Sequence, residues 1–168
     1  MGKKSVKTNK NIYQLTREDL GYTREQASDL LEWMSSDRIE KIESGKSLPH
    51  PDEIVLMSKC YKKPELCNYY CHHVCEIGKE LVPELSMKEL SQITLDVISS
   101  LNNMHNQKDR FIDIVVDGKI SDDEYEDFQR IYNQLQTLSV SIDTLKLWLD
   151  KNILEGNIKE NITDKKLD

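Results

Sequence analysis

The chain has 168 residues, of which 38% are hydrophobic and 32% charged, and its formal net charge is −7. Six glycines and four prolines are too few for the many turns of a β-sandwich or barrel, so the composition favours an all-α protein. No run of about 18 apolar residues occurs, so we expect no membrane-spanning helix, and no apolar stretch of a secretory signal follows the first residues. We therefore expect a cytoplasmic chain whose four cysteines are thiols or ligands.

The two halves of the chain differ in charge. Residues 1–79 carry 13 Lys and Arg against 12 Asp and Glu, whereas residues 80–168 carry 10 against 18. Residues 1–10 hold four lysines and are expected to form a disordered basic arm, or an arm that enters a minor groove. The acidic second half would repel nucleic-acid phosphates, so any DNA contact must come from the first half.

Residues 11–79 predict a compact domain of five short helices. The first helix starts at Ile12 and ends before Gly21, which suits the left-handed residue that follows a helix. The second follows a capping box formed by Thr23 and Gln26. The third begins at Ser35 or Ser36.

The later helices of this domain also have recognisable ends. Ile39 and Ile42 would lie on the inner face of the third helix, which Gly45 ends. Pro51 suits the first turn of the fourth helix, and the fifth is expected from Pro64 to about Cys71.

Residues 11–62 resemble the helix-turn-helix domain of Xre/Cro-type regulators, which has a lambda-repressor-like fold. The resemblance lies in LGYTREQAS at residues 20–28, SSDRIEKIESGK at residues 35–46, and Pro49. It implies that the helix starting at Ser35 enters the major groove of double-stranded DNA. The residues implied to read bases or phosphates there are Ser36, Asp37, Arg38 and Lys41, and those implied to hold the backbone are Arg24 and Lys46.

Three features depart from the family pattern. The turn at residues 32–34 lacks the usual glycine and is one residue longer, and Ser28 stands where alanine is usual. Asp37 and Glu40 place acidic groups on the reading face, where they can accept from cytosine but weaken attraction to phosphate. A domain kept for protein contacts, with its DNA face lost, therefore remains an alternative.

Three cysteines are spaced four apart, at Cys67, Cys71 and Cys75. On an unbroken helix the first and last would be about 12 Å apart, too far to share one ion. We expect these cysteines to be small buried side chains, and we expect no metal or cofactor. Metal binding or thiol sensing by these three residues is the alternative.

Residues 80–154 predict a long antiparallel helical hairpin with heptad spacing. The first helix has two lines of residues seven apart, Leu90, Val97, Met104 and Phe111, with Thr94, Leu101, Lys108 and Val115. The second has an uninterrupted 3–4 series, Phe128, Ile131, Leu135, Leu138, Ile142, Leu145 and Leu149. Ile93, Ile98, Ile112, Leu147 and Trp148 lie off these stripes. They predict a second apolar surface, and we expect a homodimer through residues 84–154.

The connection between the two long helices has two interpretations. Gly118 can end the first helix, and Ser121 with Glu124 can form a capping box for the second. Asp113, Asp117 and Glu124 also match positions of a calcium loop, although Val115 stands at a position that must coordinate. Residues 155–168 are expected to form a polar tail.

These patterns favour a sequence-specific, homodimeric DNA-binding transcriptional regulator. No glycine-rich phosphate loop or nucleophile motif occurs, so the chain is not expected to be an enzyme. The alternative function is a protein-interaction adaptor or anti-regulator that reuses the helix-turn-helix scaffold and docks a partner on the acidic hairpin.

Overall fold

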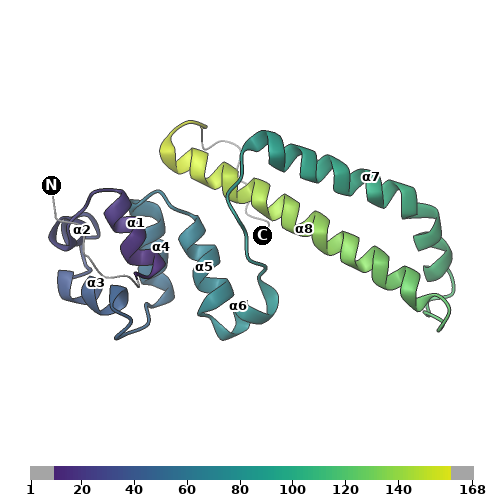
Figure 1. Ribbon diagram of the computed structural model, residues 1–168, viewed down its shortest axis with the longest axis horizontal. Coiled ribbons are helices and arrows are strands. Elements are labelled where there is room, and N and C mark those ends of the chain that lie inside the picture. The colour runs from purple at the N-terminus through teal and green to yellow at the C-terminus, as the bar shows by residue number, and fades with distance from the viewer. Residues whose placement is uncertain (1–9, 160–168) are drawn as a thin grey trace. The chain divides into compact units, whose positions relative to one another are not determined.

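The computed structural model describes residues 10–159 and is all-helical over that range, with eight helices and no strand. The all-α prediction is confirmed. Residues 1–9 of the expected basic arm (1–10) and residues 160–168 of the expected polar tail (155–168) lie outside the described part of the chain. Two compact units are present, one of residues up to 84 with those from 150 onward, and one of residues 85–149 (Figure 1). No helix in the described range is both long and apolar enough to cross a lipid bilayer.

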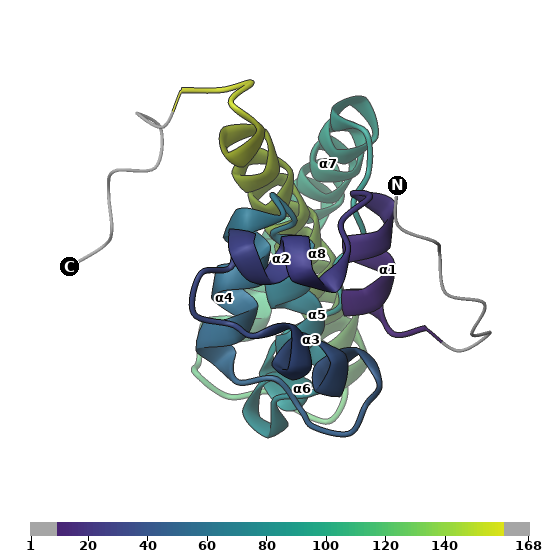
Figure 2. The ribbon, with the colours of Figure 1, turned by 90° about the vertical axis from the view of Figure 1, so that its left-hand side faces the viewer.

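The first unit contains six short helices. They are α1 (Ile12–Asp19), α2 (Arg24–Leu30), α3 (Ser36–Glu43), α4 (Pro51–Cys60), α5 (Glu65–His73) and α6 (Glu76–Leu81). Helix α1 packs on α3, α2 on α3, and α4 on α5 (Figure 2). Their shared core is fully buried and includes Ala27, Leu31, Ile39, Ile54 and Leu66.

The predicted helix ends agree closely with those observed. Thr23 and Gln26 form both hydrogen bonds of the expected capping box, and Ser35 caps α3 by accepting from the Arg38 amide. Gly21 and Gly45 adopt φ values of 78° and 73°, the left-handed region expected after a helix. Local capping chemistry therefore sets the boundaries of α1, α2 and α3.

Helix α6 was missed by the prediction of five helices. Its first residue follows Cys75, which gives no side-chain cap, and its six residues are too few to show periodicity. Gly78 is its distinguishing residue, because a Cβ there would lie 2.1 Å from the carbonyl oxygen of Cys71 on α5. Only glycine permits this close approach, which holds α6 against α5.

The second unit is built from two long helices, α7 (Leu90–Val115) and α8 (Tyr125–Glu155), of which α8 continues past residue 149. They run in opposite directions on either side of the loop at residues 116–124 (Figure 1). The Phe111 and Phe128 rings lie 6.4 Å apart, and Arg110 donates to Asp127 at 2.7 Å. Within the loop, the Ser121 amide donates to the Glu124 carboxylate at 3.0 Å.

The buried seam of these helices differs from the predicted one by one residue. Val97, Met104, Phe111, Ile131 and Leu138 face inward as predicted. For the second row of inward residues on each helix, the structure buries the residue that precedes the predicted one. The observed row comprises Ile93, Ser100, Gln107 and Ile114 on α7, and Gln134 and Ser141 on α8. The predicted Leu101, Leu135 and Ile142 are instead 51%, 37% and 39% exposed.

Hydroxyl groups explain why Ser100 and Ser141 can occupy this seam. Ser100 donates to the Asp96 carbonyl at 2.8 Å, and Ser141 donates to the Thr137 carbonyl at 3.0 Å. Each hydroxyl is thus satisfied by its own helix, one turn earlier, and can be buried without a partner across the interface. The prediction failed because it assigned the seam to the largest apolar residues.

Candidate nucleic-acid interface

The candidate interface is the segment of α2, the turn at residues 31–35, and α3. Ala27 of α2 and Ile39 and Ile42 of α3 are buried, so these helices pack through their apolar faces. Ser28, at the position where the resemblance leads one to expect alanine, donates to the Met34 carbonyl at 2.9 Å. This hydrogen bond ties α2 to the turn and gives the departure from alanine a structural purpose.

The turn places a non-glycine residue in the left-handed region. Glu32 has φ of 54°, the conformation that the missing glycine would supply. Trp33, which follows it, is 57% exposed immediately before α3. Sequence reasoning missed Trp33 as a candidate surface residue, although a large aromatic side chain in a turn was a usable signal.

The six residues implied to bind DNA divide into two groups. Asp37 and Lys41 are exposed and Ser36 is half-buried, all on α3. The other three are engaged within the protein. Arg24 donates to Glu43 at 2.8 Å, and Lys46 donates to Glu40 at 3.1 Å. The third is Arg38, whose contacts are the most extensive.

Arg38 binds the segment that leads from α3 to α4. Its Nε and Nη2 donate to the two carboxylate oxygens of Glu53, each at 2.6 Å, which is a bidentate pair. It also donates to the Ser47 hydroxyl at 2.6 Å and to the Leu48 carbonyl at 3.0 Å. Arg38 thus holds the loop after α3, and its donors are committed away from a DNA base.

Glu53 has a second role at the start of α4. It accepts from the His50 amide at 2.6 Å, which completes a cap of this helix. Burial by itself raises the pKa of the Glu53 carboxyl, but hydrogen bonds from Arg38 and His50 outweigh it, and the net pKa lies below its ordinary value. The ionised form is therefore the one that stabilises the fold.

This depressed pKa predicts an acid-dependent loss of stability. The contribution of Glu53 is present above its unfolded pKa and is lost as the pH falls through its lower folded pKa. Glu53→Gln should lower the free energy of unfolding by about 1–3 kcal/mol at about pH 7 and by much less at about pH 3. Urea unfolding at both pH values measures this, with Asp52→Asn as the exposed neighbouring control. An equal loss at both pH values would contradict the prediction.

Within residues 10–159, Cys67, Cys71 and Cys75 are not brought together at one point where they could share a metal ion. All four cysteines are free and half-buried. Burial raises the pKa of Cys71, and the neighbouring Cys75 and Cys67 raise it further, so its reactive thiolate is disfavoured. Residues 10–159 bring together one group of three side chains able to share a metal ion, and it contains neither a cysteine nor a residue of the loop after α7.

Comparison with protein-family models, with curated proteins and with solved structures finds no significant match to this chain.

Proposed function

We propose that this chain is a sequence-specific DNA-binding transcriptional regulator of the Xre/Cro type that acts as a homodimer. The observation that carries the proposal is the arrangement of α3. Its inner side buries Ile39 and Ile42, whereas Asp37 and Lys41 are exposed on its outer side. In a helix-turn-helix motif, the recognition helix follows another short helix after a tight turn. It packs on the domain through its apolar face and presents its outer side to the major groove.

The internal ion pairs refine which residues contact DNA. Lys41 is the exposed cation of α3, and we assign it the main contact to a base edge or phosphate, together with Ser36 and Asp37. Arg24 and Lys46 each already face a carboxylate partner, Glu43 or Glu40, which offsets part of their attraction to phosphate. Arg38 is assigned a positioning role, since its contacts fix the loop after α3.

The homodimer is proposed from the second unit. The buried seam contains Ser100, Gln134 and Ser141, and each is followed in sequence by an exposed apolar residue, Leu101, Leu135 or Ile142. Each of these apolar side chains therefore lies about 100° around its helix from the seam, in the same sense relative to the chain direction. Because the two helices are antiparallel, equal rotations place these apolar side chains on one face of the pair. The other exposed apolar residues of that face are Ile98, Ile112, Val115 and Leu145.

A second copy of the chain is the proposed occupant of this apolar face. Its residues recur at heptad spacing on both helices, so two copies related by a twofold axis can pack stripe against stripe as a four-helix bundle. A twofold dimer also presents two copies of α3 to two half-sites, which is what palindromic operators require.

The test is DNA selection with the full-length protein. Fragments of the source genome are selected, and fluorescence anisotropy then measures affinity at several salt concentrations for the wild type and for Lys41→Ala. We expect Lys41→Ala to lose about 10–100-fold in affinity, with a salt slope reduced by about 1 if the lost contact is to phosphate. Lys119→Ala removes the same charge from the loop after α7 and is the matched control.

A selective fragment that binds the wild type and Lys119→Ala equally, and Lys41→Ala weakly, would support the regulator. Absence of selective binding at low salt would favour the adaptor function. One observation already points that way, because three of the four cations expected at the interface are paired internally. A pull-down with the full-length chain would then identify the partner.

A further inference from the structure

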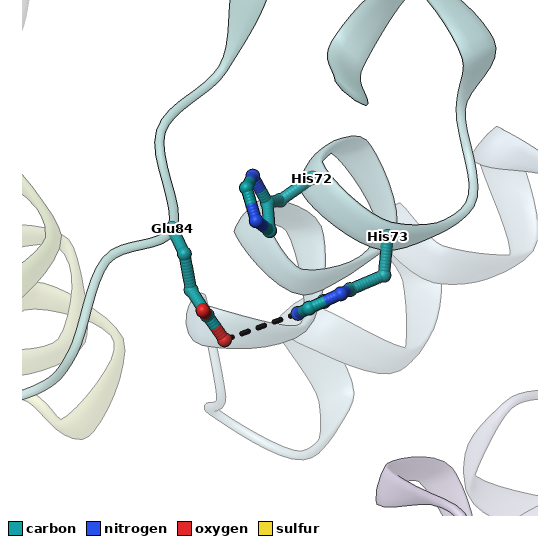
Figure 3. Close-up of side chains that lie close together, drawn as sticks. All are labelled: His72, His73 and Glu84. Carbon is teal, nitrogen blue, oxygen red and sulfur yellow. Dashed lines mark hydrogen bonds and ion pairs between the residues drawn. The ribbon is translucent and has the colours of Figure 1, made fainter. Parts of the chain in front are cut away.

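A group of three side chains outside the candidate DNA interface combines two imidazoles with a carboxylate. His72 and His73 end α5, and Glu84 is the last residue of the first unit before the chain enters the second. One ligand atom of each lies within 4.8 Å of those of the other two, and the three side chains converge on one another (Figure 3). The group joins residues from two separate segments of the first unit.

The polar contacts of this group match those of a metal site. His72 Nδ1 lies 2.8 Å from the Val82 carbonyl oxygen, which can only accept, so Nδ1 carries the proton. The lone pair of His72 is therefore on Nε2, and the backbone carbonyl orients the ring as the outer partners of metal-bound histidines do. Asn68 donates to the Pro83 carbonyl at 2.9 Å, which holds the same segment against α5.

One pair of the three ligand atoms already has nearly the spacing that a metal ion requires. His73 Nε2 and Glu84 Oε1 are 3.0 Å apart, whereas two ligands of a tetrahedral zinc ion are about 3.4 Å apart. The proton now shared by that pair would move to His73 Nδ1, which leaves Nε2 free to coordinate. His73 and Glu84 are exposed, so an ion can enter from solvent. The negative end of the α5 dipole also favours a cation at this place.

We propose that His72, His73 and Glu84 bind a divalent first-row transition metal, with zinc as the reference ion. Two imidazoles and one carboxylate suit zinc, nickel and copper and not calcium or magnesium, which prefer oxygen ligands. The bound ion would cross-link the end of α5 to residues 82–84 and so fix the point at which the chain leaves the first unit. This site does not depend on DNA binding.

The test uses full-length protein, with any purification tag removed, in the absence of DNA. Isothermal titration with zinc should show one ion per chain, and His73→Gln and Glu84→Gln should each weaken binding by at least about tenfold. His105→Gln, which changes an exposed histidine on α7, is the matched control and should bind zinc as the wild type does. Circular dichroism checks that each variant is folded.

Cobalt serves as a spectroscopic probe of the ligands. The proposed site predicts ligand-field bands of a nitrogen and oxygen complex, with no thiolate-to-cobalt charge-transfer band in the near ultraviolet. A charge-transfer band would assign the ion to cysteines and overturn the proposal. It would equally be overturned if the wild type bound no zinc, or if His73→Gln and Glu84→Gln bound it as tightly as the wild type.

Discussion

Replacing Glu43 by alanine is expected to lower the free energy of unfolding by about 3–5 kcal/mol, because it removes the bidentate carboxylate partner of the buried Arg17 guanidinium. The Glu43 side chain is 1% exposed and that of Arg17 is 7% exposed. Arg17 donates to Glu43 through Nε at 2.5 Å and Nη2 at 2.8 Å. In the wild type the hydrogen bond to Glu43 raises the pKa of Arg17. Without Glu43 the guanidinium still stays charged, because arginine is not deprotonated in proteins. Urea unfolding measures the loss.

Two comparisons separate charge from lost volume at Glu43. In the double variant Arg17→Met with Glu43→Leu, apolar side chains replace both partners, and much of the lost stability should return because no unpaired charge remains buried. Glu40→Ala breaks the exposed pair with Lys46 and should cost less than about 1 kcal/mol. A loss at Glu43 no larger than that at Glu40 would contradict the prediction.

The same ion pair shows why the core of the first unit was only partly predictable. Capping residues such as Thr23 and Ser35 act on atoms three residues away, so the sequence reveals them. Glu43 meets Arg17 across 26 residues and Arg24 across 19, and Arg38 meets Glu53 across 15. No local pattern distinguishes these charges from exposed ones, so the prediction of Arg38 as a DNA contact could not take its partners within the protein into account.

The long helices were predictable as helices but not in their pairing. Heptad spacing predicted two rows of inward residues on each helix. In one row it predicted Leu101 and Leu135 because they are more apolar than Ser100 and Gln134, which are the residues that lie in the seam. Small side chains with hydroxyls bonded to their own helix can form the inner seam and leave larger apolar residues for another surface. Each long helix therefore carries one buried stripe and further exposed apolar residues, and periodicity alone cannot assign residues between these two sets.

Replacing Ile142 by glutamate is expected to dissociate the proposed homodimer without unfolding the chain. Ile142 is 39% exposed in the single chain, so glutamate there remains solvated in the monomer. In the dimer it would lie within the apolar face, where burying an unpaired charge costs several kcal/mol and weakens association by about 100-fold or more. Sedimentation equilibrium measures the dissociation constant, and circular dichroism should show unchanged helix content.

The matched control is Asn133→Glu, which adds the same negative charge to an exposed position of α8 away from the apolar face. It should leave the dimer intact. If the dimer reads two half-sites, Ile142→Glu should also reduce affinity for a palindromic fragment to that for a single half-site, whereas Lys41→Ala should weaken both. Equal dissociation by the two glutamate variants would indicate general charge repulsion. A wild-type chain that stays monomeric at micromolar concentration would contradict the homodimer, and the exposed apolar side chains at heptad spacing would then favour another helical partner for this face.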